Sequence, residues 1–116
     1  MPNTMKTVFA PHTGGRGVVG ITGRLDFTSA PEASKQFATA IAGGHPKLVL
    51  DLAKVGFVDS AGLGSLIGGM RAARLAGGDL RIANPSEQVT MLLSLTSLDQ
   101  VLTIHPSIDE ALHGFS

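Results

Sequence analysis

The sequence predicts an α/β fold, with about four helices packed on a mixed, mostly parallel sheet of four to five strands. Two observations lead to this expectation. Short apolar runs alternate along the chain with stretches whose apolar residues recur every three to four positions. Glycine pairs and proline-containing turns separate most of these segments. The 116 residues suffice for a single domain, residues 1–116, with a core of its own.

The expected strands are short segments rich in aliphatic and β-branched residues, bounded by turn residues. They cover residues 5–10, 17–23, 48–52, 80–83 and 101–104. Residues 11–16 contain glycines that suit a hairpin turn, so the chain is expected to open with an antiparallel pair. Residues 48–52 form a nearly continuous apolar run, which is typical of a strand buried on both faces of a sheet.

The expected helices begin where a capping residue precedes an apolar stripe. They start at Ser29, at residues 59–60, over residues 84–87 and at Ser107. Ser29 and Glu32 have the spacing of a capping box, as do Ser107 and Glu110. The first two helices are expected to end at the glycine pairs of residues 43–44 and 77–78.

Charge and composition argue against several classes of partner. Nine basic and nine acidic residues cancel, and the chain lacks cysteine. The basic residues are scattered apart from a loose cluster of Arg71, Arg74 and Arg81, so neither nucleic acid nor membrane is expected as a partner. The lack of cysteine removes disulfides and thiolate metal sites. No run of about 18 apolar residues occurs and residues 1–4 lack a basic leader segment, so we expect a soluble, cytoplasmic protein.

The run from Phe57 to Gly64, Phe-Val-Asp-Ser-Ala-Gly-Leu-Gly, places a serine where a short apolar strand turns into a helix. It resembles the Asp-Ser-Ser/Ala-Gly-Leu-Gly signature of the STAS family, specifically the bacterial anti-sigma factor antagonists. The likeness continues through residues 23–26, 48–52 and 77–81 and so covers nearly the whole chain. The resemblance implies a STAS-type fold and a serine, here Ser60, that a partner kinase phosphorylates.

Ser60 and Asp59 each have a structural and a functional interpretation. By position alone, Ser60 is a helix N-cap that stabilises the fold by about 1 kcal/mol. The resemblance implies instead that it is the phospho-acceptor, and a helix start offers free N–H groups and a positive dipole end to an added phosphate. Asp59 is either the cap itself or an acid that orients the hydroxyl or a metal–nucleotide complex on the kinase, and the two roles are compatible.

Asp26 follows a strand in the run Gly23-Arg24-Leu25-Asp26 and precedes Thr28. By residue type it is a turn residue beside a helix cap. The resemblance implies that this turn lies beside the phosphorylated serine and helps to form the docking face. Relatives commonly carry glutamate at the position of Arg24, so the local charge differs here. The expected partner-binding residues are Asp26, Thr28, Asp59, Ser60, Ala61, Gly62, Leu63 and Gly64.

Four glycines lie in the helix that carries the signature, at positions 62, 64, 68 and 69. Each costs roughly 0.8–1 kcal/mol relative to alanine in a helix, so each needs a reason. Gly62 and Gly64 are expected to keep the surface smooth for an approaching protein. For Gly68 and Gly69, close packing of the helix on its sheet is an equally good explanation. Leu63 contacts either the partner or the core.

The resemblance implies a switch in transcription regulation and stress response. The unphosphorylated chain would bind an anti-sigma factor serine/threonine kinase and so release a sigma factor. Phosphorylation of Ser60 by that kinase would end the binding, and a serine phosphatase would restore it. The alternatives are a non-switching scaffold of the stressosome type and a STAS subunit of a transport complex. The sequence specifies no oligomeric state.

No enzymatic activity, cofactor or metal is expected. Ser60 does not lie in a Gly-X-Ser-X-Gly motif, because Val58 occupies the first glycine position. The four histidines include no pair at the i, i+4 spacing of helical metal ligands. The glycines of residues 14–17 are not followed by Gly-Lys-Ser/Thr, so they form no phosphate-binding loop. A third reading, a nucleotide hydrolase, would require turnover by the purified chain.

Overall fold

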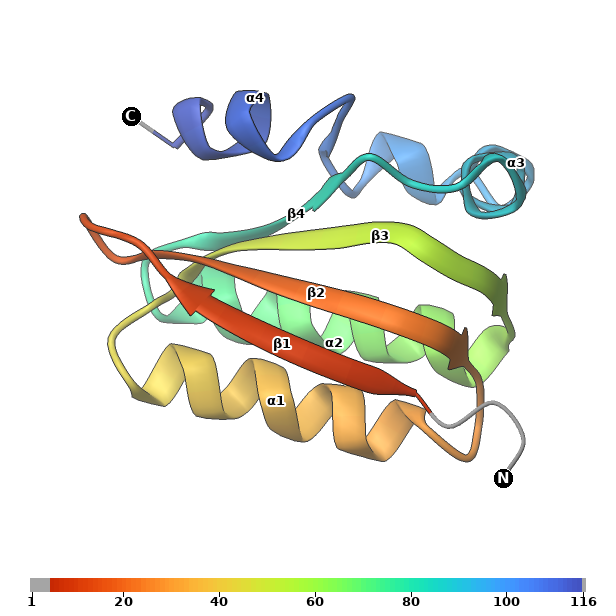
Figure 1. Cartoon of the computed structure of the whole chain (residues 1–116), viewed down its shortest axis with the longest axis horizontal. Coiled ribbons are helices and arrows are strands. Elements are labelled where there is room, and N and C mark those ends of the chain that lie inside the picture. The colour runs from red at the N-terminus through yellow and green to blue at the C-terminus, as the bar shows by residue number, and fades with distance from the viewer. Residues whose placement is uncertain (1–4, 116) are drawn as a thin grey trace.

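The computed structural model describes residues 5–115, so the expectation about residues 1–4 lies outside it. Within that range the strands form one sheet in the order β1-β2-β3-β4-β5 (Figure 1). β1 pairs antiparallel with β2, and the other neighbours pair parallel. The strands are β1 Lys6–Pro11, β2 Arg16–Leu25, β3 Lys47–Val58, β4 Asp79–Ala83 and β5 Ile104–His105.

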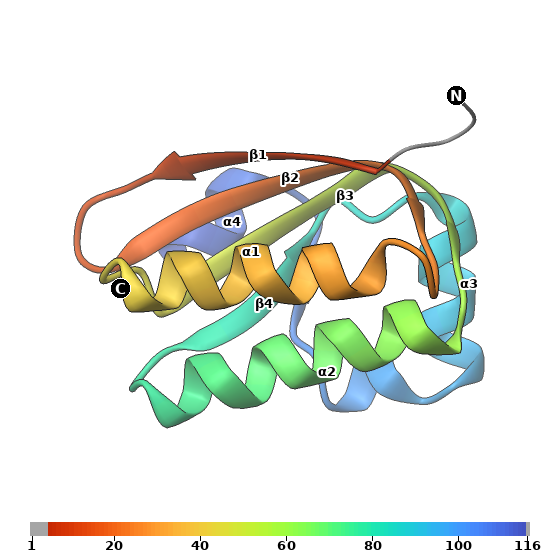
Figure 2. The same cartoon turned by 90° about the horizontal axis from the view of Figure 1, so that it is seen from below.

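Helices lie on both faces of this sheet, which confirms the expected α/β architecture. They are α1 Ala30–Ala42, α2 Ser60–Leu75, α3 Glu87–Leu95 and α4 Ile108–His113, with a short 3-10 helix at Leu98–Gln100. α1 and α2 run side by side across one face, while α4 lies on the other (Figures 1 and 2). α3 packs against β3, where the Ser86 hydroxyl donates to the Val55 carbonyl at 2.6 Å.

Two apolar clusters hold these layers together. The larger one lies between the sheet and the helices α1 and α2, with Phe37, Leu50 and Leu66 among its fully buried side chains. The smaller one joins Val18 and Val49 to the inner face of α4. β3 therefore contributes buried side chains to both faces, as the continuous apolar run at residues 48–52 predicts.

The strand boundaries differ from the expected ones, by one or two residues in β1, β2 and β4 and by more in β3 and β5. β3 continues to Val58, because after Leu52 its buried positions recur every third residue and its register with β2 shifts. This irregularity hides the strand from a search for alternation. β1 includes Pro11, which pairs with Gly17 at the edge of the sheet, where a proline is tolerated. The expected strand at residues 101–104 is wrong for residues 101–103, where Val101 and Leu102 instead donate to the Leu98 carbonyl.

Candidate functional site

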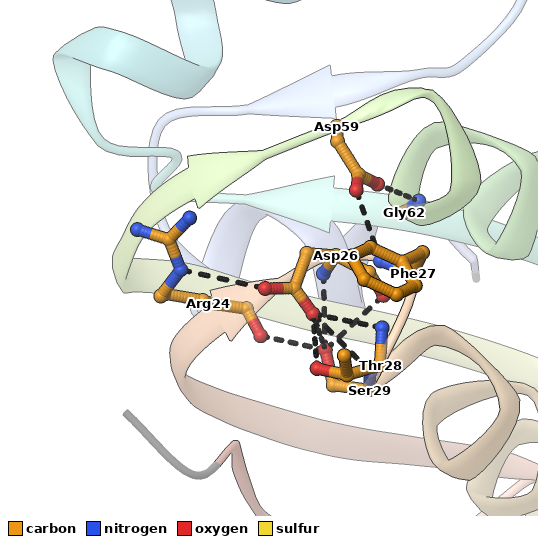
Figure 3. A network of polar contacts seen from close by, with 7 residues as sticks. All are labelled: Arg24, Asp26, Phe27, Thr28, Ser29, Asp59 and Gly62. Carbon is orange, nitrogen blue, oxygen red and sulfur yellow. Dashed lines mark hydrogen bonds and ion pairs between the residues drawn. The ribbon is translucent and has the colours of Figure 1, made fainter. Parts of the chain in front are cut away.

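The candidate site lies where β2 and β3 end side by side. Leu25 and Val58 are register partners in the parallel pair, so Asp26 and Asp59 begin the loops that leave the same edge of the sheet. One loop, residues 26–29, leads into α1, and the other leads directly into α2. Figure 3 shows Asp59 bonded to the N–H groups of Phe27 and Gly62, and Asp26 bonded to Arg24, Thr28 and Ser29. The signature serine and the Gly23–Asp26 turn are thus brought together, as expected.

Asp59 is the N-cap of α2 and also fastens the neighbouring loop. Its Oδ1 accepts from the Gly62 N–H at 2.9 Å, and its Oδ2 accepts from the Phe27 N–H at 2.9 Å. Its own N–H donates to the Leu25 carbonyl at 3.2 Å. The interpretation of Asp59 as the cap is therefore confirmed, and the interpretation of Ser60 as the cap is wrong, because Ser60 is the first residue inside the helix.

Ser60 lies exposed at the start of α2. Within residues 5–115 its hydroxyl forms no hydrogen bond, and neither do the N–H groups of Ser60 and Ala61. The donors of the first helical turn are thus only partly used, since Asp59 takes the N–H of Gly62. An anionic group on the Ser60 oxygen would meet the positive end of the helix dipole and the open N–H groups.

Asp26 builds the turn that faces this helix start. Its Oδ1 accepts from the Thr28 hydroxyl at 2.6 Å and from the N–H groups of Thr28 and Ser29 at 3.0 and 3.3 Å. These bonds, led by the Thr28 hydroxyl, lower the pKa of the Asp26 carboxyl from 3.8 to about 2. Asp26 is thus a turn residue, as its residue type predicts; its role in docking remains a proposal.

Ser29 does not form the capping box that its spacing with Glu32 predicts. The Ser29 hydroxyl makes no cap bond to α1. It donates to the Arg24 carbonyl at 2.7 Å and accepts from the Asp26 N–H at 3.0 Å. The side chain is drawn back into the Asp26 turn, where it helps to hold the loop against the end of β2. At Ser107, by contrast, the hydroxyl does accept from the Glu110 N–H at 3.1 Å.

The two signature glycines differ, and only Gly62 departs from the expected role. Gly62 is buried, and a Cβ there would collide with the Leu25 carbonyl oxygen. Internal packing, not a smooth exposed surface, explains this glycine. Gly64 is exposed, with open space where a Cβ would lie. Close packing of the helix on its sheet is confirmed for Gly69, because a Cβ there would lie 2.7 Å from the Leu80 and Phe37 side chains. Close packing does not explain Gly68, which faces open space.

Exposed aromatic side chains flank the aspartates, and the sequence analysis did not identify them as site residues. Phe27 is 74% exposed and Phe57 is 41% exposed. The guanidinium carbon of Arg24 lies 4.0 Å from the centre of the Phe57 ring. Of the remaining expected residues, Thr28 is exposed, Ala61 is half-buried, and Leu63 packs partly buried against the main core. Aromatic residues next to the polar motif were the available signal.

Two further features bear on the kind of site. Residues 5–115 contain no group of three or more His, Cys, Asp or Glu side chains placed to hold a metal ion. Over the same range, no helix has both the length and the apolar character needed to cross a membrane. What the site offers is an exposed hydroxyl on a helix start, an ordered acidic turn and exposed aromatic rings.

Comparison with known proteins identifies the family. The STAS domain profile matches residues 7–111. A putative anti-sigma factor antagonist of Thermotoga maritima is 35% identical over 69 residues, which are 60% of this chain and 61% of the relative; the match thus spans less than two thirds of that protein. The anti-sigma-B factor antagonist of Bacillus subtilis is 31% identical over 74% of this chain and 78% of its own length.

Solved structures agree with the sequence matches. The crystal structure of an anti-sigma factor antagonist from Mycobacterium paratuberculosis superposes with a TM-score of 0.86 at 27% identity, covering 99% of this chain and 97% of that one. The sheet order, the helix placement and the profile match all agree. The chain therefore belongs to the STAS domain family.

Proposed function

We propose that the chain is an anti-sigma factor antagonist whose binding is switched off by phosphorylation of Ser60. The names of its Thermotoga and Bacillus relatives support the class of function. The observation that carries the switch is the exposed Ser60 hydroxyl, which has no internal partner among residues 5–115 and lies at a helix start. The unmodified chain binds an anti-sigma factor kinase in the cytoplasm and so releases a sigma factor, and a serine phosphatase reverses the modification.

The docking face consists of the exposed parts of the two loops and the first turn of α2. It is formed by Asp26, Thr28, Asp59, Ser60, Ala61, Leu63 and Gly64. Gly62 supports this face from beneath, because it lets α2 approach the end of β2 closely. Phe27 adds an exposed ring to this face. Its backbone is held in place because the Phe27 N–H donates to the Asp59 carboxylate. The phosphoryl chemistry belongs to the partners, and this chain is a substrate and binding module.

Phosphorylation acts on this face locally. It adds about −1.5 to −2 charges to the Ser60 oxygen. The helix dipole favours that charge by roughly 0.3–1 kcal/mol, so the fold accommodates it. A partner surface shaped for a neutral hydroxyl must instead desolvate the phosphate or clash with it. Binding is lost while the domain stays folded.

The choice of acceptor is tested by phosphorylation in vitro. We expect the cognate kinase and ATP to modify the wild-type chain and a Ser34→Ala control equally, because Ser34 lies exposed on α1. Ser60→Ala should take up no phosphate, as measured by intact-mass spectrometry and peptide mapping. Undiminished modification of Ser60→Ala would assign the switch to another residue.

A further inference from the structure

We propose that Arg24, whose guanidinium lies over the Phe57 ring, determines partner specificity by binding a carboxylate of the anti-sigma factor. This inference rests on the proposed function and adds the chemistry of the partner. Arg24 and Phe57 are register partners at the ends of β2 and β3, directly before the loops of the docking face. Their position at the rim of the candidate site places a cation where a partner bound at Ser60 would meet it.

The Arg24 guanidinium is held in place but keeps donors available. Its Cζ lies 4.0 Å from the Phe57 ring centre, and its Nε lies 3.4 Å from Asp26 Oδ2. Its two Nη groups form no hydrogen bond within residues 5–115, and the side chain is 40% exposed. These terminal N–H groups can bind a carboxylate from outside. Because the stacking and the Asp26 contact already restrict the side chain, such a bond costs little further side-chain entropy.

The acids of the site do not compete for these donors. Asp26 Oδ1 accepts from Thr28 and Ser29, and only the longer contact from Oδ2 reaches Arg24. Asp59 uses both of its carboxylate oxygens on backbone N–H groups of Phe27 and Gly62. Both carboxylates therefore serve the internal structure. Of the charged groups at this rim, the Arg24 guanidinium is the one with unused donors among the described residues, which favours an anionic group on the partner.

An uncharged groove adjoins Phe57. A groove of about 300 Å³ runs between the end of β3 and α3. It is lined by Gly56, Phe57, Val58, Gln88, Val89 and Leu92. None of these side chains is charged, and Phe57 belongs to both the groove and the arginine stack. The occupant that fits both features is a partner segment that carries an aliphatic side chain for the groove next to a carboxylate for Arg24.

The test is a titration of the purified anti-sigma factor from the same organism with unphosphorylated variants of this chain. Arg24→Gln removes the charge and Arg24→Glu reverses it. The control, Arg71→Glu, makes the same reversal at an exposed position on α2. We expect Arg24→Gln to weaken binding about tenfold and Arg24→Glu about a hundredfold at low salt. The affinity of the control should stay within about twofold of the wild-type affinity. Added salt should reduce the difference in affinity between the wild type and the Arg24 variants.

A complementary change on the partner provides the second readout. The acidic residues of the anti-sigma factor are replaced with arginine one at a time. One of these replacements should restore binding to Arg24→Glu and weaken binding to the wild type. Circular dichroism establishes that each variant is folded, and the neutral Arg24→Gln serves if the reversal does not fold. If both Arg24 variants bind as the control does, while phosphorylation of Ser60 still abolishes binding, the inference fails and the proposed function stands. If the wild type binds no anti-sigma factor, both are overturned.

Discussion

At both ends of the sheet, charged side chains bind the backbone groups of a helix terminus, but the two ends differ in the groups that they leave exposed. At the end that carries Ser60, the Asp59 carboxylate accepts from the Gly62 N–H in the first turn of α2 and from the Phe27 N–H of the adjoining loop. At the other end, arginines donate to carbonyls where α4 ends: Arg81 Nη1 to the C-cap residue Gly114 at 2.8 Å and Arg16 Nη1 to Leu112 at 3.3 Å. The end of α4 lies near the β1–β2 hairpin, since Arg16 begins β2 (Figure 1). Each helix terminus receives the charge that suits its dipole.

The difference lies in what each end leaves exposed. At the α4 end, Arg81 also contacts Asp79 at 3.2 Å and lies 4.2 Å from the Phe115 ring centre, so its fork is used inside the molecule. At the Ser60 end, a hydroxyl and the Nη groups of Arg24 have no bond within residues 5–115, and Phe27 is largely exposed. One end is built to hold its own helix, and the other keeps groups available for a partner. The predictions below test that division.

The largest effect should come from filling the space at Gly62. In Gly62→Ala the new Cβ meets the Leu25 carbonyl, which is backbone and cannot rotate away. We expect a loss of about 3 kcal/mol or more in the free energy of unfolding, measured by urea titration. The matched control, Gly64→Ala, faces open space in the same helix and should stabilise by about 0.5–1 kcal/mol. Equal effects of the two substitutions would show that α2 does not pack this closely.

A pair of arginine substitutions should separate structure from binding. Arg81→Met removes the bond to the Gly114 carbonyl and should lower the free energy of unfolding by about 1 kcal/mol, with unchanged affinity for the anti-sigma factor. Arg24→Met should instead lower the affinity for the anti-sigma factor and change the free energy of unfolding by no more than about 0.5 kcal/mol. Denaturation and titration of both variants provide the check. A loss of affinity in Arg81→Met alone would contradict the division between the two ends.

The smallest effect should be a pH dependence at Asp26. The pKa of Asp26 is lowered from 3.8 to about 2 in the folded chain, so its ionised form stabilises the fold above about pH 4. That contribution is lost as the pH falls toward 2. In unfolding titrations, the stability gap between wild type and Asp26→Asn should therefore be constant from pH 7 to 5 and shrink below pH 4. A gap that does not change down to pH 2 would mean that Asp26 is not held in its charged form by Thr28.

Sequence patterns were sufficient for the architecture but not for the ends of its strands. The alternation of apolar runs and helical stripes predicted the element order, and the run at residues 48–52 predicted a strand buried on both faces. The extension of β3 to Val58 was missed because its register shift against β2 breaks the alternation. Residues 101–103 were misassigned because a 3-10 turn can also contain an apolar pair.

The site was predicted as far as local spacing reaches. The signature predicted that Asp59 and Ser60 lie at the start of a helix, but spacing does not decide which of the two caps it. The role of Gly62 depends on its contact with Leu25, and the role of Ser29 depends on its hydrogen bond to Arg24. Both partners lie at the end of β2, outside the helices that the spacing describes. The stacking of Arg24 on Phe57 arises from the pairing of β2 with β3, 33 positions apart (57 minus 24). Such tertiary contacts leave no periodic trace in the sequence.

The most direct test of the central claim compares the affinities of unmodified and Ser60-phosphorylated protein for the anti-sigma factor. Both forms are titrated by calorimetry, and both are followed by circular dichroism during thermal unfolding. The account predicts matching spectra and an affinity that falls more than about a hundredfold on phosphorylation, which corresponds to roughly 3 kcal/mol. Equal affinities, or a phosphorylated form that unfolds, would contradict a local switch at the start of α2.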